Sequence, residues 1–195
     1  MLLTVTTVSL TLFSLAQACL PPPPSPPPPP PPPSPPVVGN CRCGTSSLTK
    51  IVGGESAGVG EFPWQVGLVS NYGSTPFCGG TLLSSNTVLT AAHCQTPVSN
   101  FKVVVGEFDV SRADGEQRIS PSQWIQHPNY NSGTTNNDFA IIKLATPVSF
   151  SSTVNPACLP TAGRNYDNVV ATVSGWGTLS SGGRQPSILQ KVGTL

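Results

Sequence analysis

Charged residues are scarce in this sequence, and neither sign predominates. Only 17 of the 195 residues are charged, and nine Lys and Arg against eight Asp and Glu give a net charge of +1. No basic run is present that could neutralise a phosphate backbone, so we expect no nucleic-acid partner. Surface polarity must come mainly from Ser, Thr, Asn, Gln and Gly, which suits an extracellular protein.

Metal-binding patterns are also missing. The chain has only two histidines, and Cys41 and Cys43 form a C-x-C rather than a C-x-x-C pair. Without a histidine cluster a zinc site is not expected, and no carboxylates have the spacing of a calcium loop. We therefore expect neither a metal nor a cofactor. The absence of Asn-x-Ser/Thr sequences likewise predicts no N-glycosylation.

Only one segment of the sequence is long and apolar enough to insert into a membrane, and it lies at the N-terminus. Residues 1–18 contain no charge and end in Ala16-Gln17-Ala18, the small-x-small pattern of a signal-peptidase site. We interpret them as a signal peptide cleaved before Cys19. The alternative is an uncleaved membrane anchor, which the interrupting Thr and Ser residues and the prolines that follow disfavour. The chain is thus expected to be secreted and free of the membrane.

Proline is concentrated directly after this segment. Residues 21–36 hold 14 of the 23 prolines, interrupted only by Ser25 and Ser34. Because each proline ring restrains φ and removes an N–H donor, we expect residues 19–40 to form an extended polyproline II linker. At ~3.1 Å per residue the proline-rich part would span about 50 Å. The alternative is a ligand for a proline-recognition domain.

From residue 51 the sequence consists of short apolar runs, which are rich in β-branched residues and separated by Gly, Pro, Asn and Ser. These runs predict strands, and no long segment has helical periodicity. An all-β barrel or sandwich, forming one globular unit, is therefore expected. The predicted strands cover residues 64–69, 81–83, 87–90, 101–106, 141–144 and 169–173.

The two histidines have different neighbours. His127 precedes a proline in a polar stretch, which is typical of a surface turn. His93 follows an apolar run in the sequence Thr-Ala-Ala-His-Cys, where small neighbours predict a partly buried and uncrowded ring. From this pattern alone, a hydrogen-bonded core imidazole and a functional group are both open.

Six motifs, in order, resemble those of the chymotrypsin/trypsin-type serine proteases, and together they extend from Lys50 onward. The resemblance implies a chymotrypsin-like double β-barrel, with the first barrel complete and the second only partly present. Residues 51–195 would be a partial protease domain. The motifs are Ile51-Val52-Gly53-Gly54, Phe77-Cys78-Gly79-Gly80-Thr81-Leu82, Thr90-Ala91-Ala92-His93-Cys94, Asn137-Asp138-Phe139-Ala140-Ile141-Ile142-Lys143-Leu144, Cys158-Leu159-Pro160 and Ser174-Gly175-Trp176-Gly177.

The resemblance assigns chemistry to two residues and a processing site to two more. His93 would be the general base and Asp138 would accept its other ring N–H. A strand-capping role for Asp138 is the alternative, but the apolar run behind it predicts a barrel interior, where a buried acid needs a partner. Residues 41–50 would end the propeptide, and an activating trypsin-like protease would cut between Lys50 and Ile51.

The same resemblance implies two disulfides among the six cysteines. Cys78 would pair with Cys94, closing a loop of about 17 residues and stabilising the fold by roughly 3 kcal/mol. Cys43 would pair with Cys158. Cys19 and Cys41 remain, to pair together or with cysteines beyond this chain, because six cysteines allow about 15 connectivities.

The nucleophile of this family is not recognisable in the sequence. No Gly-Asp-Ser-Gly-Gly is present, and Ser181 precedes two glycines without the Gly-Asp before it. We therefore expect a serine endopeptidase zymogen with protein or peptide substrates and protease inhibitors as partners, whose 195 residues are inactive alone. Two alternatives stay open: an inactive truncated homologue with a binding or regulatory role, and a protein whose proline segment is the functional part.

Overall fold

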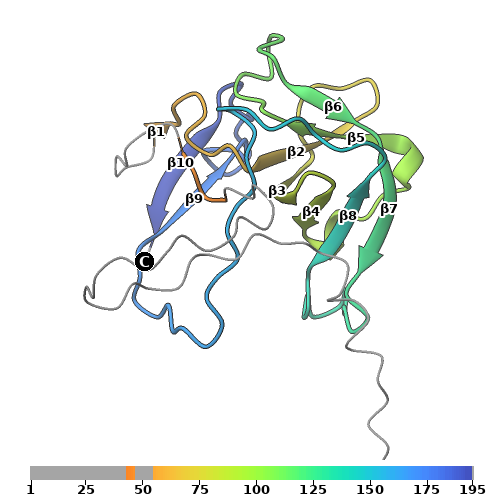
Figure 1. Ribbon diagram of the computed structural model, residues 1–195, viewed down its shortest axis with the longest axis vertical. Helices are drawn as coiled ribbons and strands as arrows, with labels where there is room; N and C mark the ends of the chain where they lie inside the picture. The colour runs from red at the N-terminus through yellow and green to blue at the C-terminus, as the bar shows by residue number, and fades with distance from the viewer. Residues whose placement is uncertain (1–42, 47–54, 195) are drawn as a thin grey trace, which may run out of the picture.

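The computed structural model describes residues 43–46 and 55–194, and nearly all regular structure in them is β-strand (Figure 1). The only helical pieces there are two 3₁₀ turns, η1 (Ala92–Cys94) and η2 (Val98–Asn100). The predicted all-β class is thus confirmed. In the described ranges no helix has the length and apolarity to cross a membrane. The predicted signal peptide and proline linker, together with Lys50, Ile51, Cys19 and Cys41, lie outside the described residues.

Seven strands form one sheet that curls back on itself, in the order β6-β5-β2-β3-β4-β8-β7 (Figure 1). Its two outer strands, β6 and β7, are consecutive in the chain and separated only by Ser120. One bent segment therefore pairs with β5 through its first half and with β8 through its second, which closes the first barrel. The strands are β2 (Gln65–Ser70), β3 (Cys78–Ser84), β4 (Thr87–Thr90), β5 (Phe101–Val105), β6 (Gln117–Ile119), β7 (Pro121–Gln126) and β8 (Ala140–Leu144).

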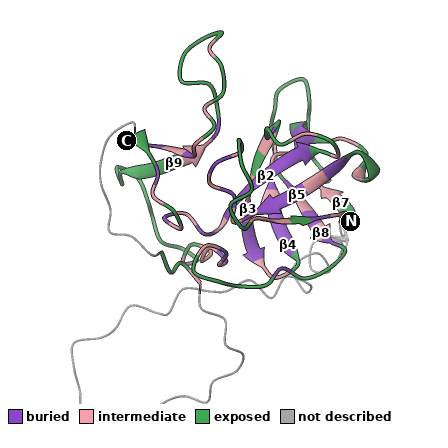
Figure 2. Cartoon of the chain, turned by 90° about the horizontal axis from the view of Figure 1, so that it is seen from above, coloured by how far each residue is buried: buried purple, intermediate pink, exposed green. Residues whose placement is uncertain are grey.

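The inside of this barrel is apolar, and β8 shows how a strand supplies it, because successive side chains point to opposite faces of a sheet. In β8, Ala140, Ile142 and Leu144 are buried, whereas Ile141 and Lys143 between them are only partly so. Buried side chains from β2, β3, β4, β5, β6 and β8 form one core. Figure 2 colours the buried segments of the chain purple. The largest members of the core include Phe101, Leu68, Leu82, Ile142, Val66 and Val88.

Three further strands form a second sheet in the order β1-β10-β9, beside the first (Figure 1). They are β1 (Glu55–Ser56), β9 (Ala171–Gly175) and β10 (Gln190–Thr194). The predicted run 169–173 is displaced from β9, because pairing with β10 starts only at Ala171. Most of β9 is exposed, as its green colour in Figure 2 shows. The fold is therefore the expected chymotrypsin-like arrangement, with one complete barrel and a second that is partly present.

A buried ion pair joins this second sheet to the loop before β2. The Lys191 ammonium lies 2.8 and 3.0 Å from the two carboxylate oxygens of Glu61, and both side chains are less than one-tenth exposed. Glu55, directly opposite Lys191 in the β1–β10 pair, adds a carboxylate at 3.6 Å. Burial favours a higher pKa for Glu61, but hydrogen bonds from Lys191 and the Gly58 N–H hold its pKa below the usual value.

We expect Ile142→Ala to lower the free energy of unfolding by about 2–5 kcal/mol, because it leaves a cavity in the barrel core. Ile141→Ala is the matched control, since this neighbour on the other face of β8 is only partly buried and should cost clearly less. Urea unfolding followed by tryptophan fluorescence measures both. Equal losses would contradict the assignment of the inward face.

Candidate active site

Antiparallel pairing of β4 with β8 brings His93 and Asp138 to the same end of the barrel. Thr90, the last residue of β4, is opposite Ala140, the first residue of β8. His93 lies three residues after Thr90 in the η1 turn, and Asp138 lies two residues before Ala140. The two side chains, 45 positions apart in sequence, therefore meet at the barrel rim.

The Asp138 carboxylate contacts His93 through both of its oxygens. Oδ2 lies 2.7 Å from His93 Nδ1, and Oδ1 accepts a hydrogen bond of 2.8 Å from the His93 backbone N–H. The ring hydrogen bond and then the backbone one hold the pKa of Asp138 below its usual value. Since an ionised carboxylate only accepts, Nδ1 must donate, which leaves Nε2 of the neutral ring as a proton acceptor.

Both side chains are more exposed than the sequence predicted. The His93 side chain is 58% exposed, so a core imidazole is excluded, and Asp138 is 24% exposed at the rim rather than inside the barrel. The physical reason is the η1 turn, which takes the chain off the end of β4 before His93 is reached. The imidazole is consequently open to a partner from solvent.

Asn137 is a positioning residue that sequence reasoning missed. Its φ of 55° is left-handed, a conformation that Asn adopts more readily than most residues. Its carbonyl accepts from the Phe139 N–H at 2.8 Å, and its side-chain amide donates to the Asn129 carbonyl at 2.9 Å. This turn precedes Asp138 directly and sets the direction in which the chain enters β8. The Asn-Asn-Asp sequence before the apolar run was the available signal.

A disulfide between Cys78 and Cys94 ties the η1 turn to β3, with Cα atoms 6.1 Å apart. Cys94 Sγ also lies 3.6 Å from His93 Nε2. An open groove borders the ring here. It is lined by Ser70, Phe77, Cys78, His93, Cys94, Gln95, Thr96 and Asn100.

A second disulfide joins Cys43 to Cys158, with Cα atoms 5.0 Å apart. The adjacent Gly44 has a φ of 65° and donates its N–H to the Pro156 carbonyl at 2.8 Å. Residues 43–46 are thereby fixed to the connection that leads from the first barrel to β9. Ser181, which precedes two glycines, lies in an exposed turn between β9 and β10.

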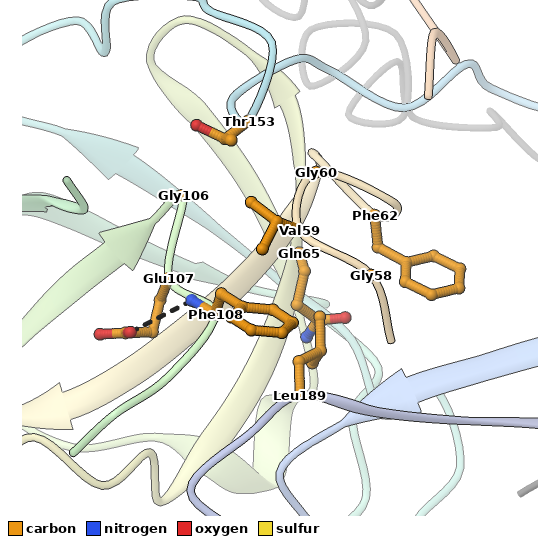
Figure 3. Close-up of a pocket in the computed structure, with 10 residues that line it drawn as sticks. All are labelled: Gly58, Val59, Gly60, Phe62, Gln65, Gly106, Glu107, Phe108, Thr153 and Leu189. Carbon is orange, nitrogen blue, oxygen red and sulfur yellow. Dashed lines mark hydrogen bonds between the residues drawn. The ribbon is translucent and has the colours of Figure 1, made fainter. Parts of the chain in front are cut away.

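Glu107 is a titratable residue that the sequence did not single out. It lines a small pocket between the barrel and the segment before β10, where Phe108 points toward Gln65 and Leu189 (Figure 3). Its Oε1 accepts from the Phe108 N–H at 3.1 Å. Burial, followed by the nearby carboxylates of Asp114 and Glu116, raises the pKa of Glu107 to about 7.

Comparison with known proteins gives one family. The Trypsin family model matches residues 51–194. Trypsin I-P1 of Gallus gallus is 46% identical over 143 residues, which cover 72% of this chain and 55% of that protein. Coagulation factor IX of Oryctolagus cuniculus is 40% identical over 154 residues, covering 75% and 54%. Serine proteinase stubble of Drosophila melanogaster is 38% identical over 163 residues, covering 77% and 21%. The chain thus spans about half the length of its trypsin and factor IX relatives, and less of the third.

Glu107 should make stability depend on pH. The folded protein keeps a proton that the unfolded chain releases above the usual pKa of 4.5, so stability falls as pH rises from there to about 7. Solvent screening reduces the full value of the shift to an expected change of about 1–2 kcal/mol. We expect Glu107→Gln to flatten this profile and Asp167→Asn, in an exposed loop, to leave it unchanged.

Urea unfolding at about pH 5 and about pH 8 measures most of the effect, since the lower value is near the start of the window in which Glu107 affects stability and the higher value lies above it. An unchanged pH dependence in the Glu107→Gln variant would show that another group is responsible.

Proposed function

Because the chain belongs to the trypsin family, we propose that it acts as a secreted serine endopeptidase, with His93 as the general base and Asp138 as the residue that orients it. The observation that supports this most strongly is the hydrogen bond of 2.7 Å between His93 Nδ1 and Asp138 Oδ2. It directs the free nitrogen of the ring, Nε2, to the side where the groove opens. A base held in one tautomer and open to solvent suits proton transfer with an incoming group.

In the proposed reaction a serine hydroxyl attacks the carbonyl carbon of a peptide bond while its proton passes to His93 Nε2. The imidazolium formed is stabilised by the Asp138 carboxylate, and Nε2 then returns the proton to the leaving amine nitrogen. Water completes the cycle by the same transfers. The chain's own contribution is therefore to accept, hold and deliver one proton at Nε2. Proteins and peptides are the proposed substrates, and protein inhibitors of proteases are further proposed partners.

The nucleophile of this proposal is not among residues 1–195. The Gly-Asp-Ser-Gly-Gly motif is absent from them. Ser181 has glycines after it, but it lies in an exposed turn and lacks the preceding Gly-Asp. We propose that the active protein receives its serine from sequence that continues the same reading frame.

A zymogen form is part of the proposal. Cleavage after Lys50 by a trypsin-like protease would release the ammonium group of Ile51 at a new N-terminus. The Cys43–Cys158 disulfide joins residues on opposite sides of that bond. The Gly44–Pro156 hydrogen bond supports the same attachment. The N-terminal segment would therefore stay bound to the protease domain after activation.

The proposed roles predict a clear difference between two products. The 195-residue chain, even when cut after Lys50, should hydrolyse no peptide above buffer background and resist serine-directed phosphonylating probes. A product that continues into a Gly-Asp-Ser-Gly-Gly segment should be active, and Asp138→Asn should lower its kcat about 10⁴-fold. That magnitude comes from other serine proteases, in which the amide leaves the imidazole in the wrong tautomer.

Asp167→Asn, in an exposed loop, is the charge-matched control and should keep full activity. Stoichiometric labelling of the 195-residue chain would overturn the assignment of the nucleophile. Near-normal turnover by Asp138→Asn would overturn the role of the carboxylate. A stop codon directly after Leu195 would favour the inactive homologue instead.

Cleavage after Lys50 should leave the two pieces covalently joined. We expect a single band on a non-reducing gel and two fragments after reduction, because the Cys43–Cys158 disulfide spans the cut. Cys43→Ser should release the N-terminal fragment without a reductant. Release of that fragment from the unaltered protein under non-reducing conditions would disprove the tether.

A further inference from the structure

Three side chains at the barrel rim offer atoms that bind metal ions, although two of them are now bonded to each other. Cys78, His93 and Cys94 place one ligand atom each within 4.8 Å of one another, and no other such group occurs in the described part of the chain. In the disulfide the two sulfurs are not thiolates, which is the form that binds metals. The oxidised rim is therefore not a metal site.

The spacing nevertheless fits a tetrahedral ion once the disulfide opens. Zinc–sulfur and zinc–nitrogen bonds of about 2.3 and 2.0 Å at a tetrahedral angle put the two ligand atoms about 3.5 Å apart. His93 Nε2 and Cys94 Sγ are already 3.6 Å apart. Two thiolates on the same ion would be about 3.8 Å apart, so Cys78 Sγ must move away by about 2 Å, within reach of a side-chain rotation.

His93 is also oriented as metal-binding histidines are. Such a histidine commonly donates its other ring N–H to a carboxylate, which fixes the ring and makes the ligating nitrogen more basic. Asp138 Oδ2 accepts from Nδ1 at 2.7 Å, and its Oδ1 accepts from the His93 backbone N–H. Nε2 is thereby presented on the side of Cys94.

The groove gives access to these atoms. Both cysteines and His93 line it, and none of its lining residues is Lys, Arg, Asp or Glu. Cys78 is partly exposed, so a small dithiol can approach its sulfur, whereas Cys94 is buried. The same opening leaves room for a water molecule as a fourth ligand.

We propose that reduction of the Cys78–Cys94 disulfide turns this rim into a binding site for a thiophilic divalent ion such as Zn²⁺, held by both thiolates and His93 Nε2. A dithiol supplies two electrons and two protons, which break the S–S bond, and itself becomes a cyclic disulfide. Binding of the ion then releases the two thiol protons. The ion occupies the lone pair that the proposed protease would use as its base, so reduction followed by metal binding would block catalysis. The metal site itself does not require that the proposed function be correct.

The test is a cobalt titration of the 195-residue chain, reduced with a dithiol and freed of it under argon. We expect one Co²⁺ per chain, with the visible bands of tetrahedral cobalt and a thiolate charge-transfer band. The oxidised chain should show neither, and Zn²⁺ should displace the cobalt. Circular dichroism before and after reduction shows whether the β-sheets persist. Cys43→Ser/Cys158→Ser should still bind, because that disulfide is separate from the site.

The variants separate this site from nonspecific binding to thiols. Asp138→Asn should weaken cobalt binding about 10–100-fold, as loss of a supporting carboxylate does elsewhere, and His93→Ala should weaken it at least as much. His127→Ala, the other histidine, is the matched control and should leave the affinity unchanged. Failure of the reduced chain to bind cobalt, loss of its sheet structure, or equal affinities of the unaltered chain and His93→Ala would each overturn the proposal.

Discussion

The pairing of β4 with β8 is the constraint on which the candidate active site depends. Thr90 and Ala140 are opposite each other, so the ends of both strands reach the rim together and His93 meets Asp138. A slip of one residue would turn Ile142 out of the core and replace it by Lys143, because successive side chains point to opposite faces. The free energy of core packing thus holds the histidine and the carboxylate in register, although neither is in the core.

The rim and the second sheet are held differently from the barrel. The three-stranded sheet has only a small apolar cluster of Ala57, Trp176 and Leu189. Its attachment relies on directional contacts, among them the buried Lys191–Glu61 pair. The two disulfides act in the same way, one at the η1 turn and the other at the connection to β9. Such contacts fix the positions of the rim and the second sheet, where little buried apolar area is available to hold them in place.

The hydrogen bond to Asp138 leaves His93 with one free ring nitrogen. With Nδ1 committed to Asp138, only Nε2 can exchange a proton or bind an ion. The neighbouring Cys94 sulfur lies 3.6 Å from that nitrogen. The proposed base chemistry and the proposed metal binding would therefore use the same lone pair, and the oxidation state of the Cys78–Cys94 pair would decide between them. In that proposal, His93 is protected from thiophilic metal ions only while the Cys78–Cys94 disulfide is intact.

The sequence by itself determined the all-β class, the strand of residues 87–90 and, within a few residues, those near 64–69, 101–106 and 141–144. Alternating polarity and turn residues are local signals, so no partner is needed to read them. The motifs likewise pointed to His93 and Asp138. Only the tertiary structure decided which polar segments become strands, as in β6 and β7, how exposed His93 is, and that Lys191 meets Glu61 across 130 positions. These depend on pairing between distant segments, and the free energy of such pairing is not contained in any one of them.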